Sequence, residues 1–78
     1  MNKLKILFFG ALSEITGKQE EEITLKGDLQ AVLEYLKQKY PALSENPFSI
    51  AVNQEISGEN KVLSDGDEVA LLPPFTGG

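Results

Sequence analysis

The carboxyl end of the chain carries the group with the most distinctive chemistry. Gly77 and Gly78 follow Phe75 and Thr76 directly, so a terminal α-carboxylate there stands on two residues without side chains. Such a tail enters a narrow catalytic cleft easily, because no Cβ meets the walls and positive φ angles are accessible. We therefore expect the Gly78 carboxylate to be the functional group and Gly77 to provide clearance. The alternative is a frayed terminus without function.

The rest of the chain lacks the side chains on which most catalysis depends. It contains no Cys, no His and no Trp. A Ser-His-Asp or Cys-His pair and a thiolate or imidazole zinc site are therefore excluded. The glycines before the tail are scattered singly, which is typical of turns and not of a phosphate-binding loop. We expect a chain that is not catalytic alone and binds neither a metal nor a cofactor.

Composition and charge narrow the class of protein. The 78 residues are 41% hydrophobic and 24% charged, which indicates one small globular domain. The net charge is −5 and the seven basic residues are dispersed lysines, so a nucleic-acid partner is not expected. No segment approaches the roughly 20 apolar residues that cross a bilayer. The apolar stretch after Lys5 is at the lower length limit of a secretory signal, is followed directly by Ser13-Glu14 and has no small-residue cleavage site, so we do not expect a signal peptide. The absence of Cys suits a reducing compartment, and we expect a cytoplasmic protein.

Alternating apolar residues predict two strands in the first third of the chain. Residues 3–9 place Leu4, Ile6 and Phe8 on one face and leave an apolar second face at Leu7 and Phe9. Residues 10–17 suit a short helical turn. Residues 20–26 suit a second strand that forms a hairpin-like pair with the first.

The main helix and two further strands follow. Asp28 is a good N-cap, and apolar residues then recur at helical spacing until Pro41 ends the helix. Residues 41–47 are expected to form a loop, 48–53 a strand, Ile56 a brief extended piece, and 68–72 the last strand after a turn at Asp65-Gly66-Asp67. The order ββαββ predicts an α+β domain in which one helix covers one sheet face. We interpret the acidic groups at residues 20–22 and 65–68 as solvated faces and turns.

Two motifs near the end carry a family resemblance. The stretch Asp65-Gly66-Asp67-Glu68-Val69 and the ending Pro73-Pro74-Phe75-Thr76-Gly77-Gly78 resemble the molybdopterin synthase small subunits, the MoaD family. The opening Ile6-Leu7-Phe8-Phe9 and the central Ala51-Val52-Asn53 agree with it. The resemblance implies the ubiquitin-like β-grasp fold, with a mixed sheet on one main helix over residues 1–72 and a flexible tail over residues 73–78.

The same resemblance implies a function. Gly78 is expected to be adenylated by an E1-like enzyme that uses ATP, converted to a thiocarboxylate, and used to deliver sulfur for the dithiolene of molybdopterin. The implied acceptor site belongs to a large subunit, in a heterotetramer of two small and two large subunits. This chemistry agrees with the residues, because the chain has no group that could activate its own carboxylate.

A partner surface follows from the pattern of the strands. Leu7, Phe9 and one face of residues 69–72 cannot all lie beneath a single helix, so an apolar patch should stay exposed. We predict partner contacts for the residues Leu7, Phe9, Leu72, Pro73, Pro74, Phe75 and Thr76. Three alternatives stay open: residues 10–17 cover Leu7 and Phe9, Phe75 covers the edge of the domain's own core, and the partner pairs with an edge of the sheet.

Two other functions use the same tail chemistry. Another β-grasp sulfur carrier, of the thiamine or tRNA-thiolation type, differs only in its acceptor. A ubiquitin-like modifier instead joins target lysines through an isopeptide bond. Both begin from an acyl-adenylate, so the tail sequence does not separate them.

Overall fold

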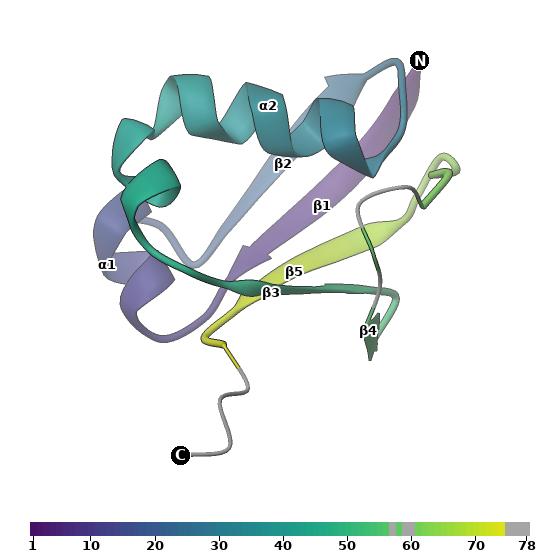
Figure 1. The fold of residues 1–78 in the computed structure, drawn as a ribbon. Coiled ribbons are helices and arrows are strands. Elements are labelled where there is room, and N and C mark those ends of the chain that lie inside the picture. Colours follow the sequence, from purple (N-terminus) through teal and green to yellow (C-terminus); the bar gives the residue numbers. More distant parts are fainter. Residues whose placement is uncertain (57, 59–60, 75–78) are drawn as a thin grey trace.

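The computed structural model describes residues 1–56, 58 and 61–74 (Figure 1). The elements along this part of the chain are β1 (Asn2–Phe8), α1 (Ala11–Thr16), β2 (Glu20–Leu25), α2 (Leu29–Lys39), the 3₁₀ helix η1 (Pro41–Glu45), β3 (Ser49–Val52), β4 (Glu55–Ile56) and β5 (Glu68–Leu72). The predicted strands, the main helix and the brief extended piece at Ile56 are confirmed. The predicted tail residues Phe75, Thr76, Gly77 and Gly78 lie outside the described residues.

The strands form one mixed sheet in the order β2-β1-β5-β3-β4. β5 pairs in parallel with β1 and antiparallel with β3, so the last strand of the chain occupies the centre of the sheet. The helix α2 lies across one face of this sheet (Figure 1). The α+β architecture expected from the sequence is therefore confirmed, and β5 is held by neighbours on both sides.

The helix α2 begins and ends where the sequence signals indicate. The side chain of Asp28 accepts a hydrogen bond from the backbone N–H of Ala31 at 3.2 Å, which satisfies one free donor of the first turn. Lys37 and Lys39 lie in the last turn, where positive charge interacts favourably with the helix dipole. Pro41 follows the C-cap residue and starts η1, so the helix does not continue.

The core lies between α2 and the face of the sheet that it covers. Each element contributes the residues of one face, and these are fully or nearly fully buried: Leu4, Ile6 and Phe8 of β1, Ile23 of β2, Leu29, Val32, Leu33 and Leu36 of α2, Ile50 and Val52 of β3, and Val69 and Leu71 of β5. Leu12 of α1, Leu43 of η1 and Leu63 close the ends of this cluster. The odd-numbered residues of β1 consequently point to the opposite face.

The structure corrects two expectations. Residues 41–47 are not a plain loop, because η1 turns Leu43 into the core. Glu21 is not solvated: its side chain is only 7% exposed, since it lies on the same face of β2 as Ile23. Its carboxylate accepts hydrogen bonds from Lys39 Nζ at 2.6 Å, Lys18 Nζ at 3.3 Å and the Tyr40 hydroxyl. Burial opposes ionisation of Glu21, but these donors outweigh it and lower its pKa.

Candidate functional site

The predicted tail starts at the end of the central strand β5. The N–H of Phe9 donates to the carbonyl of Leu71 at 3.1 Å, so the pairing of β1 with β5 continues to the last residues of β5. Pro73 then lies against Gly10, where a Cβ would come within 2.9 Å of Pro73 Cγ. Pro73 and Pro74 are exposed. The body of the domain thus fixes the point at which the tail starts, while the flexibility expected for residues 73–78 stays a prediction.

An apolar hollow of about 510 Å³ lies on the sheet face opposite α2, next to this point. We call it the second-face hollow. Its lining comes from four strands and the turn between two of them: Leu7, Phe9, Ala51, Gln54, Ile56, Glu68, Ala70 and Leu72. The register explains the grouping, because Leu7 pairs with Ala70, Ala70 with Ala51, and Ala51 with Ile56. These residues therefore form one row across the sheet.

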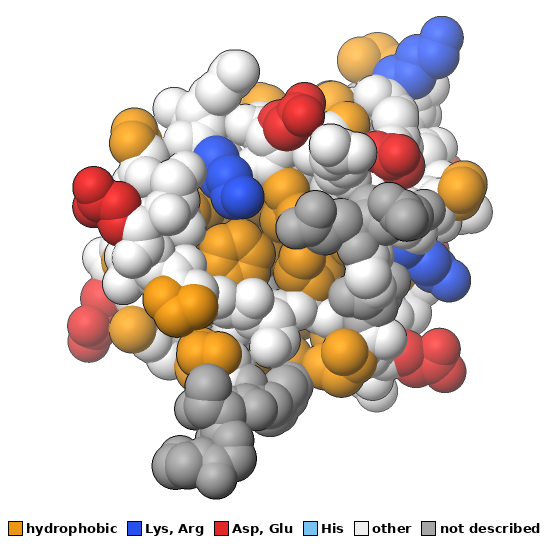
Figure 2. All heavy atoms as spheres, viewed as in Figure 1, with side chains coloured by type: hydrophobic (Ala, Val, Ile, Leu, Met, Phe, Trp, Pro, Cys, Tyr) orange, Lys and Arg blue, Asp and Glu red, His pale blue; other side chains and the backbone are white. Residues whose placement is uncertain are grey.

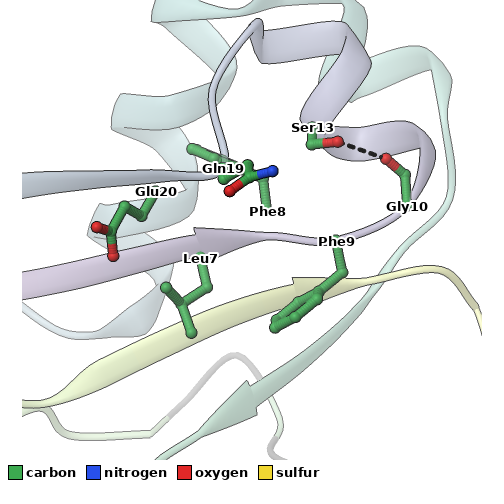
Figure 3. Close-up of a pocket in the computed structure, with 7 residues that line it drawn as sticks. All are labelled: Leu7, Phe8, Phe9, Gly10, Ser13, Gln19 and Glu20. Carbon is green, nitrogen blue, oxygen red and sulfur yellow. Dashed lines mark hydrogen bonds between the residues drawn. The ribbon is translucent and has the colours of Figure 1, made fainter.

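The structure brings together Leu7, Phe9 and Leu72, three of the residues predicted to bind a partner. Figure 3 shows Leu7 and Phe9 projecting from the same side of β1. The helix α1 does not cover Phe9, which stays 45% exposed, because α1 turns Leu12 into the core. Ala70 lies with Leu72 on the face of residues 69–72 that the sequence assigned to the patch. Sequence reasoning missed Ala51, Gln54, Ile56 and Glu68, since only the strand register reveals them. Partner binding by any of these residues stays a prediction.

A second depression of about 520 Å³ lies at the corner between β1 and α1 (Figure 3). It shares Leu7 and Phe9 with the second-face hollow and adds Ser13 and Gln19. The Ser13 hydroxyl donates to the carbonyl of Gly10 at 2.8 Å, and this bond holds the first turn of α1. The depression therefore extends the exposed surface around the start of the tail.

The turn at Asp65-Gly66-Asp67 has a structural task. Asp65 Oδ1 accepts from the backbone N–H of Lys3 at 2.6 Å. Asp67 accepts from the N–H of Ser64 at 2.7 Å and from Asn53 Nδ2 at 3.0 Å, and these bonds lower the pKa of Asp67. The turn thus ties the start of β5 to β1 and to the end of β3. It aligns the strand that leads to the tail.

The described residues contain no group of three or more Asp and Glu side chains placed to hold a metal ion. Within that same part of the chain, no helix has the length and apolarity needed to cross a membrane. Lysine side chains lie apart from one another on the face that Figure 2 shows. The described residues therefore offer an apolar contact surface beside the start of the tail.

The mixed sheet on one long helix defines a ubiquitin-like β-grasp domain. Residues 6–78 match the model of the ThiS family, and the chain belongs to this family. It is 40% identical over 83 residues to the molybdopterin synthase sulfur carrier subunit of Mycobacterium tuberculosis, and the match covers 100% of both chains. The family resemblance drawn from the tail and turn motifs is thereby confirmed.

Solved structures with the same fold extend this comparison. A protein from Pyrococcus furiosus superposes with a TM-score of 0.89 at 27% identity, over 95% of this chain and 99% of that one. The small archaeal modifier protein 1 of Methanosarcina acetivorans has a TM-score of 0.83 at 28% identity, over 100% and 98%. Subunits 1 and 2 of the molybdopterin-converting factor of Helicobacter pylori form a complex that contains a similar chain, with a TM-score of 0.70 at 30% identity, over 97% and 99%. These likenesses confirm the β-grasp fold.

Proposed function

We propose that this chain is the sulfur carrier and small subunit of a molybdopterin synthase. The observation that carries the proposal is the 40% identity, over the full length of both chains, to a sulfur carrier subunit of that enzyme. The sequence ends on the Gly77-Gly78 pair, and the family match extends to residue 78. Gly78 is then both the substrate of an activating enzyme and the carrier of the sulfur atom.

The chemistry has two steps at the Gly78 carboxylate. An E1-like enzyme transfers AMP from ATP to a carboxylate oxygen and releases pyrophosphate, which turns that oxygen into a leaving group. A hydrosulfide ion supplied by a donor then attacks the carbonyl carbon, the C–O bond to AMP breaks, AMP leaves with that oxygen, and loss of the sulfur's proton leaves a thiocarboxylate. The described residues of this chain contain no thiol and no imidazole that could assist. The partner therefore supplies activation, and catalysis gains from positioning the chain end beside the nucleotide.

The second-face hollow suits this role because it lies beside the strand that delivers the tail. A large subunit that covers Leu7, Phe9 and Leu72 would bury apolar surface and receive the tail that starts at Pro73. The complex of subunits 1 and 2 from Helicobacter pylori supports a large-subunit partner. We propose the heterotetramer of two small and two large subunits, located in the cytoplasm.

A mass measurement tests the proposal directly. The chain is incubated with an E1-like enzyme, ATP and a sulfur donor, and intact-mass spectrometry follows the product. We expect the mass change of one oxygen replaced by one sulfur, localised to Gly78 by fragmentation. The large subunit and a pterin precursor should then return the carboxylate as the dithiolene forms. A chain shortened by Gly77 and Gly78 is the matched control and should acquire no sulfur.

The likeness to small archaeal modifier protein 1 supports a second candidate function, ubiquitin-like modification of other proteins. The same incubation separates the possibilities. If only lysine-linked conjugates appear, the modifier function holds. If the thiocarboxylate forms but is consumed by a thiamine or tRNA system and not by the large subunit, the chain is a sulfur carrier of another pathway.

A further inference from the structure

Glu68 is the charged residue among the described residues that line the second-face hollow, where the other side chains are apolar except for Gln54. It is the first residue of β5, it is half-buried, and it faces the same side of the sheet as Ala70 and Leu72. Its backbone is fixed, because its N–H donates to Asn53 Oδ1 at 3.0 Å. Its carboxylate has neither a hydrogen bond nor an ion pair with any residue that the structure describes.

The two lysines of β1 on this face, Lys3 and Lys5, each form an ion pair with a glutamate other than Glu68. Lys5 lies opposite Glu68 in the register, but its ammonium group is 3.1 Å from Glu20. The hydrogen bond and charge of Glu20 are the main causes of the raised pKa of Lys5, and the charge of Glu68 adds a smaller contribution. Lys3 is paired with Glu22 at 3.4 Å. Each of these two lysines of β1 therefore has a glutamate of β2 as its ion-pair partner, and Glu68 forms no ion pair with the described residues.

Docking at the hollow would change the surroundings of this carboxylate. An exposed carboxylate is hydrated by water, and a partner that covers Leu7, Phe9 and Leu72 would remove much of that water from Glu68. Burial of a charged group without a compensating donor is costly, and removal of one member of a buried pair weakens a complex strongly. An apolar partner surface without a positive charge at this position would therefore bind poorly.

We propose that Glu68 selects its partner by pairing with a guanidinium or ammonium group of the large subunit, set at the edge of the apolar contact. The inference rests on the proposed function, because the large subunit is the partner assigned to the hollow. The apolar residues supply affinity, and Glu68 supplies specificity and fixes the orientation of docking. The excess negative charge of the chain, −5, agrees with a partner surface that is positive at this point.

The test compares charge changes inside and outside the hollow. Binding of the large subunit to the wild-type chain, Glu68→Gln, Glu68→Lys and Glu22→Lys is measured by titration calorimetry at several salt concentrations. Glu22→Lys is the matched control, since it changes the net charge as much as Glu68→Lys but alters a residue that does not line the hollow. Denaturant unfolding of each free variant checks that the fold is retained.

We expect Glu68→Gln to weaken the complex about 30-fold and Glu68→Lys to weaken it further, in the range for loss of one partner of a buried charge pair. Glu22→Lys should change the affinity by less than about threefold, and Glu68→Gln should reduce the salt dependence of binding. The inference is overturned if Glu68→Gln binds the large subunit as tightly as the wild type. It is also overturned if Glu22→Lys and Glu68→Lys lose the same affinity. If the large subunit does not bind the wild-type chain, the proposed function fails as well. If it binds and accepts sulfur equally from the wild type and Glu68→Gln, only the role of Glu68 fails.

Discussion

Two consecutive phenylalanines of the chain allow a direct separation of core from docking surface. Phe8 is 3% exposed, and its ring meets the Tyr40 ring edge-on with 6.0 Å between centroids. Phe9 is 45% exposed and lines the second-face hollow. The substitutions Phe8→Ala and Phe9→Ala remove the same atoms from neighbouring positions, so any difference between them reflects the surroundings.

From the structure we expect the two substitutions to lower the free energy of unfolding by different amounts. Phe8→Ala leaves a cavity between the sheet and α2 and should lower the free energy of unfolding by about 3–5 kcal/mol. Complete burial of a phenylalanine contributes about 1.5–3 kcal/mol, and Phe9 keeps nearly half of its surface in water without enclosing a cavity. We therefore expect Phe9→Ala to cost the free domain about 1 kcal/mol. As a hot spot, Phe9 would contribute about 2 kcal/mol or more to the complex, which is roughly 30-fold in affinity.

Two assays are needed to check these values. Denaturant unfolding of the isolated chain measures stability, and titration calorimetry with the large subunit measures binding. Phe9→Ala should unfold near the wild-type midpoint but bind weakly. If Phe9→Ala unfolds as easily as Phe8→Ala, Phe9 belongs to the core and the docking surface is misassigned. If it binds as tightly as the wild type, the hollow is not the contact surface.

Two further predictions concern the start of the tail and the acidic residue beneath α2. Gly10→Ala combines a backbone at φ +58° and ψ −134°, outside the left-handed helical region, with a Cβ that would lie 2.9 Å from Pro73. Gly17→Ala, at φ +75° and ψ 12° with open space, tests the left-handed strain of about 1–2 kcal/mol alone. Gly10→Ala should therefore have the lower denaturation midpoint, and equal midpoints would show that the contact with Pro73 has no energetic weight. The pKa of Glu21 is lower in the folded chain than the ordinary glutamate value of 4.5. The wild type should therefore be more stable than Glu21→Gln by its full margin above pH 4.5. This margin should disappear as the pH falls through the lowered pKa. Denaturant unfolding of both proteins at a series of pH values measures this difference in stability. A difference that stays unchanged in strong acid contradicts the assigned hydrogen bonds.

The elements of the fold were predictable because their signals are local. The alternation in residues 3–9, the cap at Asp28 and the stop at Pro41 each act within one turn or one strand, and the structure confirms them. The environment of Glu21 was not predictable in this way. Its donors Lys39 and Tyr40 lie 18 and 19 residues away, and only the packing of α2 on the sheet brings them to β2.

The site was predictable in part, for a related reason. An apolar second face on β1 is visible in the sequence, so Leu7 and Phe9 could be proposed as exposed. Ala51 and Ile56 give no such signal, because an alanine or an isolated isoleucine fits equally well in a core. Their place in the hollow depends on the parallel pairing of β1 with β5 and the antiparallel pairing of β3 with β5. Strand order across a sheet is a long-range property that alternation does not encode.

The hollow includes residues of β5, the strand from which the tail starts, and this limits where a partner's reactive centre can lie. Small side chains at Ala51 and Ala70 separate the larger Leu7 and Ile56 along the row, so the face is concave and suits a protruding apolar side chain. Ala70 is on β5, two residues before Leu72. A partner that fills the hollow therefore contacts β5, the strand from which the tail starts. Gly78 lies six positions beyond Leu72, and a fully extended chain over that length spans at most about 20 Å. Any enzyme that acts on the Gly78 carboxylate while bound at this hollow must place its reactive centre within that distance of Leu72.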